Sequence, residues 1–137
     1  MTEIRNGSCL CGSVSYAIKG PLSKVTTCHC TQCRKQSGHY YAAARTNESQ
    51  FQISDEKGWI KWYRSSDDAS RGFCSNCGSA LFWKGDDSPY LSVLVGSIDG
   101  ETNLEMGEHI FVESKGDYYE LDEQTPQFQT TDGSRQS

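Results

Sequence analysis

The stretch FCSNCGS, residues 73–79, carries the pattern that decides the fold. Cys74 and Cys77 form a CxxC pair that is followed at once by Gly78. This is the spacing of a zinc knuckle, in which a tight turn aims two thiolates at one metal ion. A structural zinc ion takes four protein ligands, so the motif predicts that two further ligands lie elsewhere in the chain.

The two further ligands are predicted in SCLCG, residues 8–12. Side chains alternate across extended backbone, so Cys9 and Cys11 would lie on the same face of a strand and bind one ion together. Joining residue 11 to residue 74 through a metal also closes a long loop. In principle, a cross-link stabilises the fold most when the loop that it closes is long. We therefore expect a structural zinc ion bound by four thiolates, those of Cys9, Cys11, Cys74 and Cys77.

A second group of cysteines, spaced CxCxxC, lies in CHCTQCRKQSG, residues 28–38. Cys28 and Cys30 would share one face of an extended segment while His29 points the other way, and a CxxC turn brings Cys33 back toward them. Three protein ligands with an open fourth position are the ligand set of a catalytic zinc site. The sequence thus predicts a second zinc ion, which makes two per chain.

Each of these assignments has an alternative that the sequence leaves open. The group of three could consist of reduced thiols packed in the core, or could form a structural site completed by His39 or His109. The seven cysteines could also divide differently. Cys9 and Cys11 would then join Cys28 and Cys30, and the remaining three would be Cys33, Cys74 and Cys77.

The composition fits one soluble domain stabilised by metal. A chain of 137 residues with 35% hydrophobic residues buries a modest core, so metal cross-links are a useful supplement. The N-terminal MTEIRNGS is polar, and no apolar run approaches the ~18–20 residues that span a bilayer, so we expect a cytoplasmic protein with no membrane partner. Thiols stay reduced there, and seven cysteines cannot all pair, so metal ligation is favoured over disulfides.

The charge balance argues against nucleic acid as a partner. The chain has 13 Lys and Arg residues against 18 Asp and Glu residues, for a net charge of −5. Nucleic-acid binding depends on clustered basic residues that neutralise phosphates. A zinc-ribbon nucleic-acid binder is therefore disfavoured, and so is binding to an anionic membrane surface.

The apolar pattern predicts a mainly β fold. Alternation is clearest in residues 14–18, and aromatic and β-branched residues favour strands elsewhere. No dozen residues keep a helical period, so we expect only one or two short helical turns, one of them just after Cys30. The polar tail from Thr125 onward is expected to fray. The other expected strands are 40–45, 51–53, 59–64, 79–83, 90–98, 109–113 and 118–121.

Several motifs occur together and in order: GSCLCGSVSY (7–16), CHCTQCRKQSG (28–38), RGFCSNCGSALFW (71–83), GSID (96–99), HIFVESK (109–115) and DEQTPQF (122–128). In this combination the chain resembles the glutathione-dependent formaldehyde-activating enzyme family, the zinc proteins related to centromere protein V. The resemblance implies an Mss4-like fold, with β-sheets in a tent-like arrangement around zinc. It implies a single zinc-binding domain, which we place at residues 1–128, and the division of the cysteines into four structural and three catalytic ligands. Residues 129–137 are expected to form a disordered tail because of their polar composition.

One departure from the family pattern concerns the segment after HIFVESK. The resemblance leads us to expect a Pro-Trp pair soon after Lys115, but Gly116, Asp117 and Tyr118 stand there. If that aromatic residue helps to line the site, the departure alters the size or identity of the substrate and leaves the zinc chemistry intact.

The resemblance also implies a carbon–sulfur lyase that joins the thiol of glutathione to formaldehyde and gives S-hydroxymethylglutathione. A zinc ion with three thiolates pulls weakly on bound water, whereas an exchangeable fourth thiolate suits a soft, sulfur-rich site. Attack on the aldehyde develops oxyanion charge, which needs a proton or a positive group nearby. The candidates follow the cysteines closely, and the first two could instead meet the carboxylates of glutathione: Arg34, Lys35, His39 and Tyr40.

The rival hypothesis is a zinc-stabilised binding module of Mss4-like type with no chemistry, because one fold can carry unrelated functions. The two hypotheses differ in what surrounds the second metal site. An enzyme needs an exchangeable ligand position inside a pocket, whereas an adaptor needs an exposed apolar patch.

Overall fold

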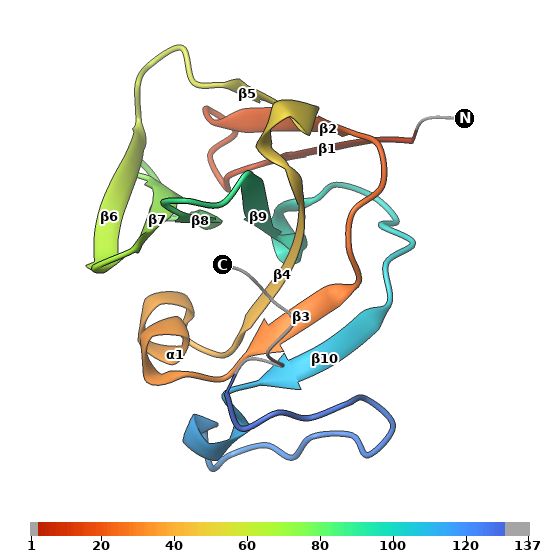
Figure 1. The fold of residues 1–137 in the computed structure, drawn as a ribbon. Coiled ribbons are helices and arrows are strands. Elements are labelled where there is room, and N and C mark those ends of the chain that lie inside the picture. The colour runs from red at the N-terminus through yellow and green to blue at the C-terminus, as the bar shows by residue number, and fades with distance from the viewer. Residues whose placement is uncertain (1–2, 131–137) are drawn as a thin grey trace.

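Two β-sheets form the framework of the computed structural model, which describes residues 3–130 (Figure 1). The larger sheet has seven strands in the order β10-β3-β4-β9-β8-β7-β6, and the smaller has three in the order β1-β2-β5. Neighbours are antiparallel except β10 and β3, which run parallel. The expected mainly β fold is confirmed. Its strands are Ile4–Ser8 (β1), Ser15–Lys19 (β2), Val25–Cys28 (β3), Tyr41–Asn47 (β4), Phe51–Ser54 (β5), Ile60–Ser66 (β6), Ala69–Cys74 (β7), Ala80–Gly85 (β8), Tyr90–Leu94 (β9) and Met106–Ile110 (β10).

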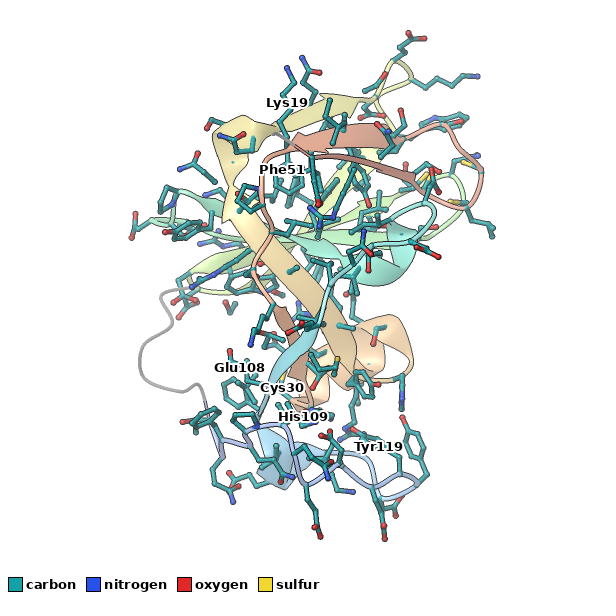
Figure 2. The ribbon with its side chains drawn as sticks, turned by 90° about the vertical axis from the view of Figure 1, so that its right-hand side faces the viewer. Lys19, Cys30, Phe51, Glu108, His109 and Tyr119 are labelled. Atoms are coloured by element: carbon teal, nitrogen blue, oxygen red, sulfur yellow. The ribbon has the colours of Figure 1, made fainter. Side chains whose placement is uncertain are left out.

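The long strand β4 connects two ends of the molecule. Figure 1 shows the three-stranded sheet across one end, and β3, β10 and helix α1 (Thr31–Ser37) around the other end of β4. Figure 2 shows the same separation, with Phe51 near the three-stranded sheet and Cys30, His109 and Tyr119 at the opposite end. The CxCxxC motif therefore lies away from the three-stranded sheet.

The main core lies between the three-stranded sheet and strands β8 and β9. Alternation in β2 turns Tyr16 and Ile18 inward, and alternation in β9 does the same for Leu91 and Val93, all of which are buried. Phe82 of β8 is also buried, and its ring packs edge-on against Tyr16 with the ring centroids 5.7 Å apart. Burial of each large apolar side chain contributes ~1.5–3 kcal/mol, so this layer stabilises the contact between the two sheets.

Helix α1 forms where a helical turn was expected, directly after Cys30. The Sγ atom of Cys30 caps the helix by accepting a hydrogen bond from the N–H of Cys33 at 3.4 Å. Gly38 ends the helix in the left-handed conformation (φ 86°), and its N–H donates to the carbonyl of Arg34.

No helix within residues 3–130 is long and apolar enough to cross a membrane. Three short 3-10 helices accompany α1: Glu48–Gln50, Val95–Ser97 and Val112–Ser114.

The expected strands are largely confirmed, but the sequence did not indicate β1, β3 or β7. The inward positions of β7 include Ala69, Arg71 and Gly72, so that strand has no alternation of large apolar residues. The strand expected over 90–98 turns into a 3-10 helix after Leu94. The strand expected over 109–113 ends early, because Phe111 takes a left-handed conformation (φ 56°).

The strand expected over 118–121 is wrong, because that segment is a turn followed by irregular backbone. Tyr118 and Tyr119 do not alternate across a sheet. The hydroxyl of Tyr118 hydrogen-bonds to His39, and the hydroxyl of Tyr119 hydrogen-bonds to His29. Both tyrosine hydroxyls therefore bond to histidine side chains. In a strand, successive side chains would point to opposite faces of the sheet.

The segment after Thr125 is held against β10 instead of fraying. The N–H of His109 donates to the carbonyl of Pro126 at 2.8 Å, and the N–H of Phe128 donates to the carbonyl of His109 at 2.9 Å. The expectation of fraying is therefore wrong for this stretch. Residues 131–137 of the expected tail lie outside the described residues.

Candidate metal centre and active site

A four-cysteine cluster brings together the motifs at residues 8–12 and 73–79. Sulfur atoms of its members all lie within 4.8 Å of one another. The Sγ atoms of Cys9 and Cys11 are 3.6 Å apart, and those of Cys11 and Cys74 are 3.9 Å apart. Tetrahedral zinc with Zn–S bonds of ~2.3 Å requires sulfur atoms ~3.8 Å apart, so the donor set fits zinc. The members are Cys9, Cys11, Cys74 and Cys77.

Two tight turns place these thiols. Cys9 and Cys11 were expected on a strand, and this is wrong, because they lie in a turn after β1. The N–H of Gly12 donates to the carbonyl of Cys9 at 3.1 Å, and Gly12 has a φ of 80°. In the knuckle, the N–H of Gly78 donates to the carbonyl of Cys74 at 2.7 Å, and Gly78 has a φ of 84°. Glycine suits both turns because side chains disfavour positive φ.

Polar neighbours favour the thiolate form at the exposed side of this cluster. The side-chain amide of Asn76 donates to the Sγ of Cys11 at 3.4 Å and lowers the pKa of Cys11 to about 7. Hydrogen bonding from Ser79 lowers the pKa of Cys77 to about 5. Metal binding requires thiolates, so these two neighbours prepare the site for an ion.

The three-cysteine cluster forms around the start of helix α1. Cys28 ends β3, Cys30 caps the helix, and Cys33 lies in its first turn, so that their sulfur atoms are within 4.8 Å of one another. Hydrogen bonds from Cys28 and Cys33 lower the pKa of Cys30 to about 2, and the bond to Cys30 raises the pKa of Cys28. Three thiolates this close repel one another, so full ionisation needs a cation. The all-sulfur donor set fits a soft divalent ion such as zinc.

A cavity of about 280 Å³ opens beside the three-cysteine cluster, and all three cysteines line it. In the described part of the chain, one basic residue, Arg71, and one acidic residue, Asp68, line it. The wall combines aromatic, apolar and small polar side chains, which is the usual make-up of a small-molecule site. The lining residues are Thr26, Cys28, Cys30, Gln32, Cys33, Tyr41, Ala43, Ser66, Asp68, Arg71, Trp83, Ser92, Ile110 and Phe111.

Arg71 of strand β7 lies against the three-cysteine cluster and is only 4% exposed. Its Nη1 and Nη2 atoms are 3.5 and 3.6 Å from the Sγ of Cys33, and Nη2 also donates to Oε1 of Gln32 at 3.3 Å. The guanidinium stacks over the ring of Tyr41, with its central carbon 4.9 Å from the ring centroid. Burial opposes the charge of Arg71, but the sulfur of Cys33 offsets this and leaves the pKa of Arg71 raised.

The residues that the sequence singled out after the cysteines are not among those that line the cavity. The Nε of Arg34 donates to the carbonyl of Ser114 at 3.1 Å, and Lys35 is exposed. His39 is also exposed, and its Nδ1 hydrogen-bonds to a tyrosine hydroxyl. Tyr40 stacks on His39 with the ring centroids 4.2 Å apart. The positive group that the structure places beside the thiols is Arg71. Nothing in the sequence singled out this residue apart from its position in RGFC.

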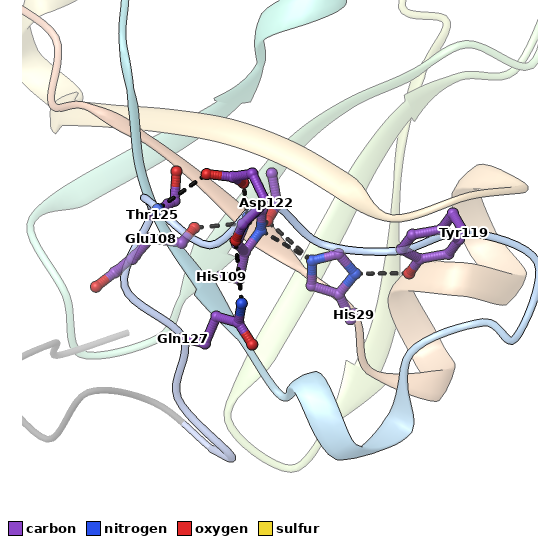
Figure 3. A network of polar contacts seen from close by, with 8 residues as sticks. His29, Glu108, His109, Tyr119, Asp122, Thr125 and Gln127 are labelled. Carbon is purple, nitrogen blue, oxygen red and sulfur yellow. Dashed lines mark hydrogen bonds and ion pairs between the residues drawn. The ribbon is translucent and has the colours of Figure 1, made fainter.

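A network of polar side chains bonds to both ring nitrogens of the buried His29 (Figure 3). The Nδ1 of His29 bonds to the hydroxyl of Tyr119 at 2.6 Å, and its Nε2 bonds to the hydroxyl of Thr27 at 2.9 Å. That hydroxyl also bonds to Nδ1 of His109, whose Nε2 donates to Asp122 at 2.8 Å. Burial lowers the pKa of His29 to about 4. One assignment of protons satisfies every group in this chain. Tyr119 donates to His29, which donates to Thr27. Thr27 then donates to His109, which donates to Asp122.

This network bears on two earlier expectations. His29 points away from the thiols, as the alternation of the CxC motif predicts, and both ring nitrogens of His109 have partners in the network. Within residues 3–130, neither cysteine cluster includes a histidine. The altered segment adjoins this network, because the N–H of Gly116 donates to the hydroxyl of Tyr119 at 3.3 Å. Gly116, Asp117 and Tyr118 are not among the residues that line the cavity.

Comparisons with known proteins agree with this geometry. A family model described as glutathione-dependent formaldehyde-activating enzyme matches residues 4–114, which include both cysteine clusters and Arg71. The chain belongs to this family. A protein of Schizosaccharomyces pombe named as an uncharacterized lyase is 27% identical to this family member over 124 residues, which cover 89% of the chain and 88% of the relative. The resemblance drawn from the motifs is thus confirmed.

A solved structure supports the fold of this formaldehyde-activating enzyme family member. The crystal structure of a Rhodobacter sphaeroides protein aligns with a TM-score of 0.57 and 23% sequence identity, over 72% of this chain and 91% of that chain. Likeness at this level of identity supports the shared fold alone.

Proposed function

We propose that this protein is a zinc-dependent carbon–sulfur lyase that acts on a small thiol adduct. The reaction implied by the family is the joining of glutathione and formaldehyde to give S-hydroxymethylglutathione. The observation that carries the proposal is that Cys28, Cys30 and Cys33 all line one cavity. A metal ion held by these residues keeps its fourth position open to a small molecule. Membership of the family and a relative named as a lyase support the same reaction class.

The two clusters take different roles in this proposal. The four-cysteine cluster would hold a zinc ion that is closed to substrate and stabilises the fold. Zinc at the three-cysteine cluster would supply a soft Lewis acid that favours a thiolate as its fourth ligand. Cys28 is fixed by β3, while Cys30 and Cys33 are fixed by α1, so the ligand set is rigid enough to orient an incoming thiol.

The substrate thiol would enter through the cavity and leave its polar groups outside. Arg34 and Lys35 lie in the last turn of α1, near but outside the cavity lining. We assign them to the carboxylates of glutathione, because basic side chains bind carboxylates through charge-assisted hydrogen bonds. Tyr41 and Trp83 form apolar wall that limits the water around the reacting sulfur.

Cobalt substitution tests the open coordination position. Cobalt at a cysteine site gives a thiolate charge-transfer band, and this band should grow on addition of glutathione because the added sulfur becomes a direct ligand. S-methylglutathione, which cannot form a thiolate, is the matched control and should leave the band unchanged. Formaldehyde added after glutathione should perturb the band if the adduct forms at the metal.

A binding module without chemistry is the second candidate, and one observation favours it. Trp62 and Tyr63 are 47% and 63% exposed on β6, which is an edge strand of the larger sheet. An exposed aromatic pair on a sheet edge is suited to protein contact. If the three-cysteine cluster binds cobalt but no small thiol alters its spectrum, the lyase proposal fails and the binding module is preferred.

A further inference from the structure

The buried charge of Arg71 has no carboxylate partner. No ion pair within residues 3–130 joins Arg71 to Asp or Glu, although the side chain is 4% exposed. A buried guanidinium without a counter-charge is strongly unfavourable. The thiol of Cys33 is 3.5 Å away, so the charge of Arg71 is balanced when the cluster is a metal-bound thiolate set.

The charges of a divalent ion, the three thiolates and Arg71 sum to zero. A divalent ion contributes two positive charges, the three thiolates contribute three negative charges, and Arg71 contributes one positive charge. A substrate thiolate added as the fourth ligand therefore brings one negative charge into the cavity. During addition to an aldehyde, that charge moves from sulfur to oxygen, so the site needs a donor positioned for the oxygen.

Arg71 has a donor left for this purpose. Its Nη atoms contact Cys33 and Gln32, whereas its Nε is buried and has no hydrogen-bond partner within the described part of the chain. Because Nε is closed to solvent, a molecule in the cavity reaches the guanidinium through its Nη groups. The hydrogen bond to Cys33 uses one of the two N–H groups of Nη1, which leaves the second for a ligand. Among residues 3–130, Arg71 is also the one Lys or Arg that lines the cavity.

Building on the proposed lyase function, we infer that Arg71 is a catalytic residue that holds the substrate oxygen as it becomes an alkoxide. The substrate class is then an aldehyde small enough to fit in the cavity that the three cysteines and Arg71 line. Tyr41 keeps the guanidinium in place through the stacking contact, and Gln32 fixes its orientation. Arg71 stabilises charge and does not donate a proton, because arginine stays protonated in proteins.

The step balances without any further reactant. The thiol loses its proton to solvent when it binds as a thiolate, and its sulfur electron pair then forms the carbon–sulfur bond to the carbonyl carbon. The π pair of the carbonyl bond moves to oxygen, where Arg71 stabilises the alkoxide, and solvent water returns one proton to that oxygen. The sum is thiol plus aldehyde giving a hemithioacetal. In the lyase direction the same bonds break in reverse order.

The experiment compares Arg71→Met and Arg71→Lys with Arg64→Met, a matched control at an exposed arginine of β6 that lies outside the cavity lining. The rate is the exchange of formaldehyde between free and glutathione-bound forms, followed by NMR. We expect Arg71→Met to lower kcat by about 10²–10³-fold, as the loss of one oxyanion donor does elsewhere. Arg71→Lys keeps the charge but lacks the two Nη groups, so its kcat should lie between those of the wild type and Arg71→Met, and the control should match the wild type.

A second readout does not depend on activity. In the cobalt form, loss of the guanidinium beside Cys33 should shift the thiolate charge-transfer band to lower energy, because the sulfur becomes more electron-rich. Arg64→Met should leave the band in place. Metal content per chain is measured alongside, and if Arg71→Met does not fold or hold metal, the decision rests on Arg71→Lys.

The outcomes separate this inference from the proposed function. If the wild type neither exchanges formaldehyde nor binds thiol at cobalt, the lyase proposal fails and the role of Arg71 fails with it. If the wild type is active and a metal-loaded Arg71 variant keeps a rate within threefold of it, only the role of Arg71 is overturned. A rate loss with metal and thiol binding retained supports the inference.

Discussion

Removing one half of the four-cysteine cluster should destabilise the fold more than removing the same motif from the three-cysteine cluster. The contact between Cys11 and Cys74 joins residues 63 positions apart. The chain-entropy relation for a cross-linked loop of this length gives ~4 kcal/mol at 25 °C. The double variant Cys74→Ser/Cys77→Ser leaves the loop open, so we expect its free energy of unfolding to fall by this amount.

The matched control is Cys30→Ser/Cys33→Ser, which also removes one CxxC motif. The three-cysteine cluster spans only five positions, from Cys28 to Cys33, and the same relation gives ~2 kcal/mol. Serine is a good N-cap, so helix α1 keeps its cap in the control.

Thermal melts and elemental analysis measure the difference. Unfolding entropy is ~2.1 cal/mol/K per residue, so for 137 residues the expected fall in Tm is about 14 °C for the Cys74/Cys77 double variant and about 7 °C for the control. Each variant should lose about one zinc ion per chain. Equal falls in Tm, or a larger fall in the control, would show that the structural and catalytic roles are assigned to the wrong clusters.

Three further outcomes are expected. Thr27→Val should lower the free energy of unfolding by about 1–2 kcal/mol, because it removes the hydroxyl that bonds to both His29 and His109. The loss stays in this range because Nε2 of His29 and Nδ1 of His109 are 3.2 Å apart and can then bond directly. Thr27→Ser keeps the hydroxyl and should have the wild-type Tm. In a urea titration, Gly7→Ala should lower the free energy of unfolding by about 1–3 kcal/mol or more, since the new methyl group would clash with the hydroxyl of Tyr16. The control Gly96→Ala has open space around the new methyl group and should be near neutral in the same titration. During a slow fall in pH, a chromophoric chelator should report release of metal from the three-cysteine cluster first and from the four-cysteine cluster later. Protons compete with zinc for thiolates, and fewer bonds hold the ion at the three-cysteine cluster. Release of both ions in a single step would contradict an open site.

The elements with clear side-chain alternation could be predicted from the sequence. Residues 14–18 alternate large and small side chains, and β2 forms there with Tyr16 and Ile18 inward. The two cysteine groups could also be predicted, because metal ligands impose fixed spacings that do not depend on the rest of the fold. Even so, the reason for one spacing was wrong, since Cys9 and Cys11 are brought together by a turn and not by a strand.

What the sequence could not provide depends on contacts between distant segments. Arg71 becomes a site residue only because β7 is packed so that its side chain reaches Cys33, 38 positions away. Tyr119 looked like part of a strand, and it serves instead as a partner of His29, 90 positions away. Local propensity does not encode such pairings, because tertiary packing decides them.

The different spans of the two cysteine clusters also set an order of assembly on the ribosome. The ligands between Cys28 and Cys33 are adjacent in the nascent chain, so this group can bind a metal ion before any sheet is complete. The other group has to wait until Cys77 has been made, 44 residues after Cys33. At ~5–20 residues per second, that wait is about 2–9 seconds, during which Cys9 and Cys11 form only half a site. When zinc is scarce, the three-cysteine cluster would then bind it first. Chains whose synthesis stops in that interval would hold zinc at the three-cysteine cluster while the four-cysteine cluster is still incomplete.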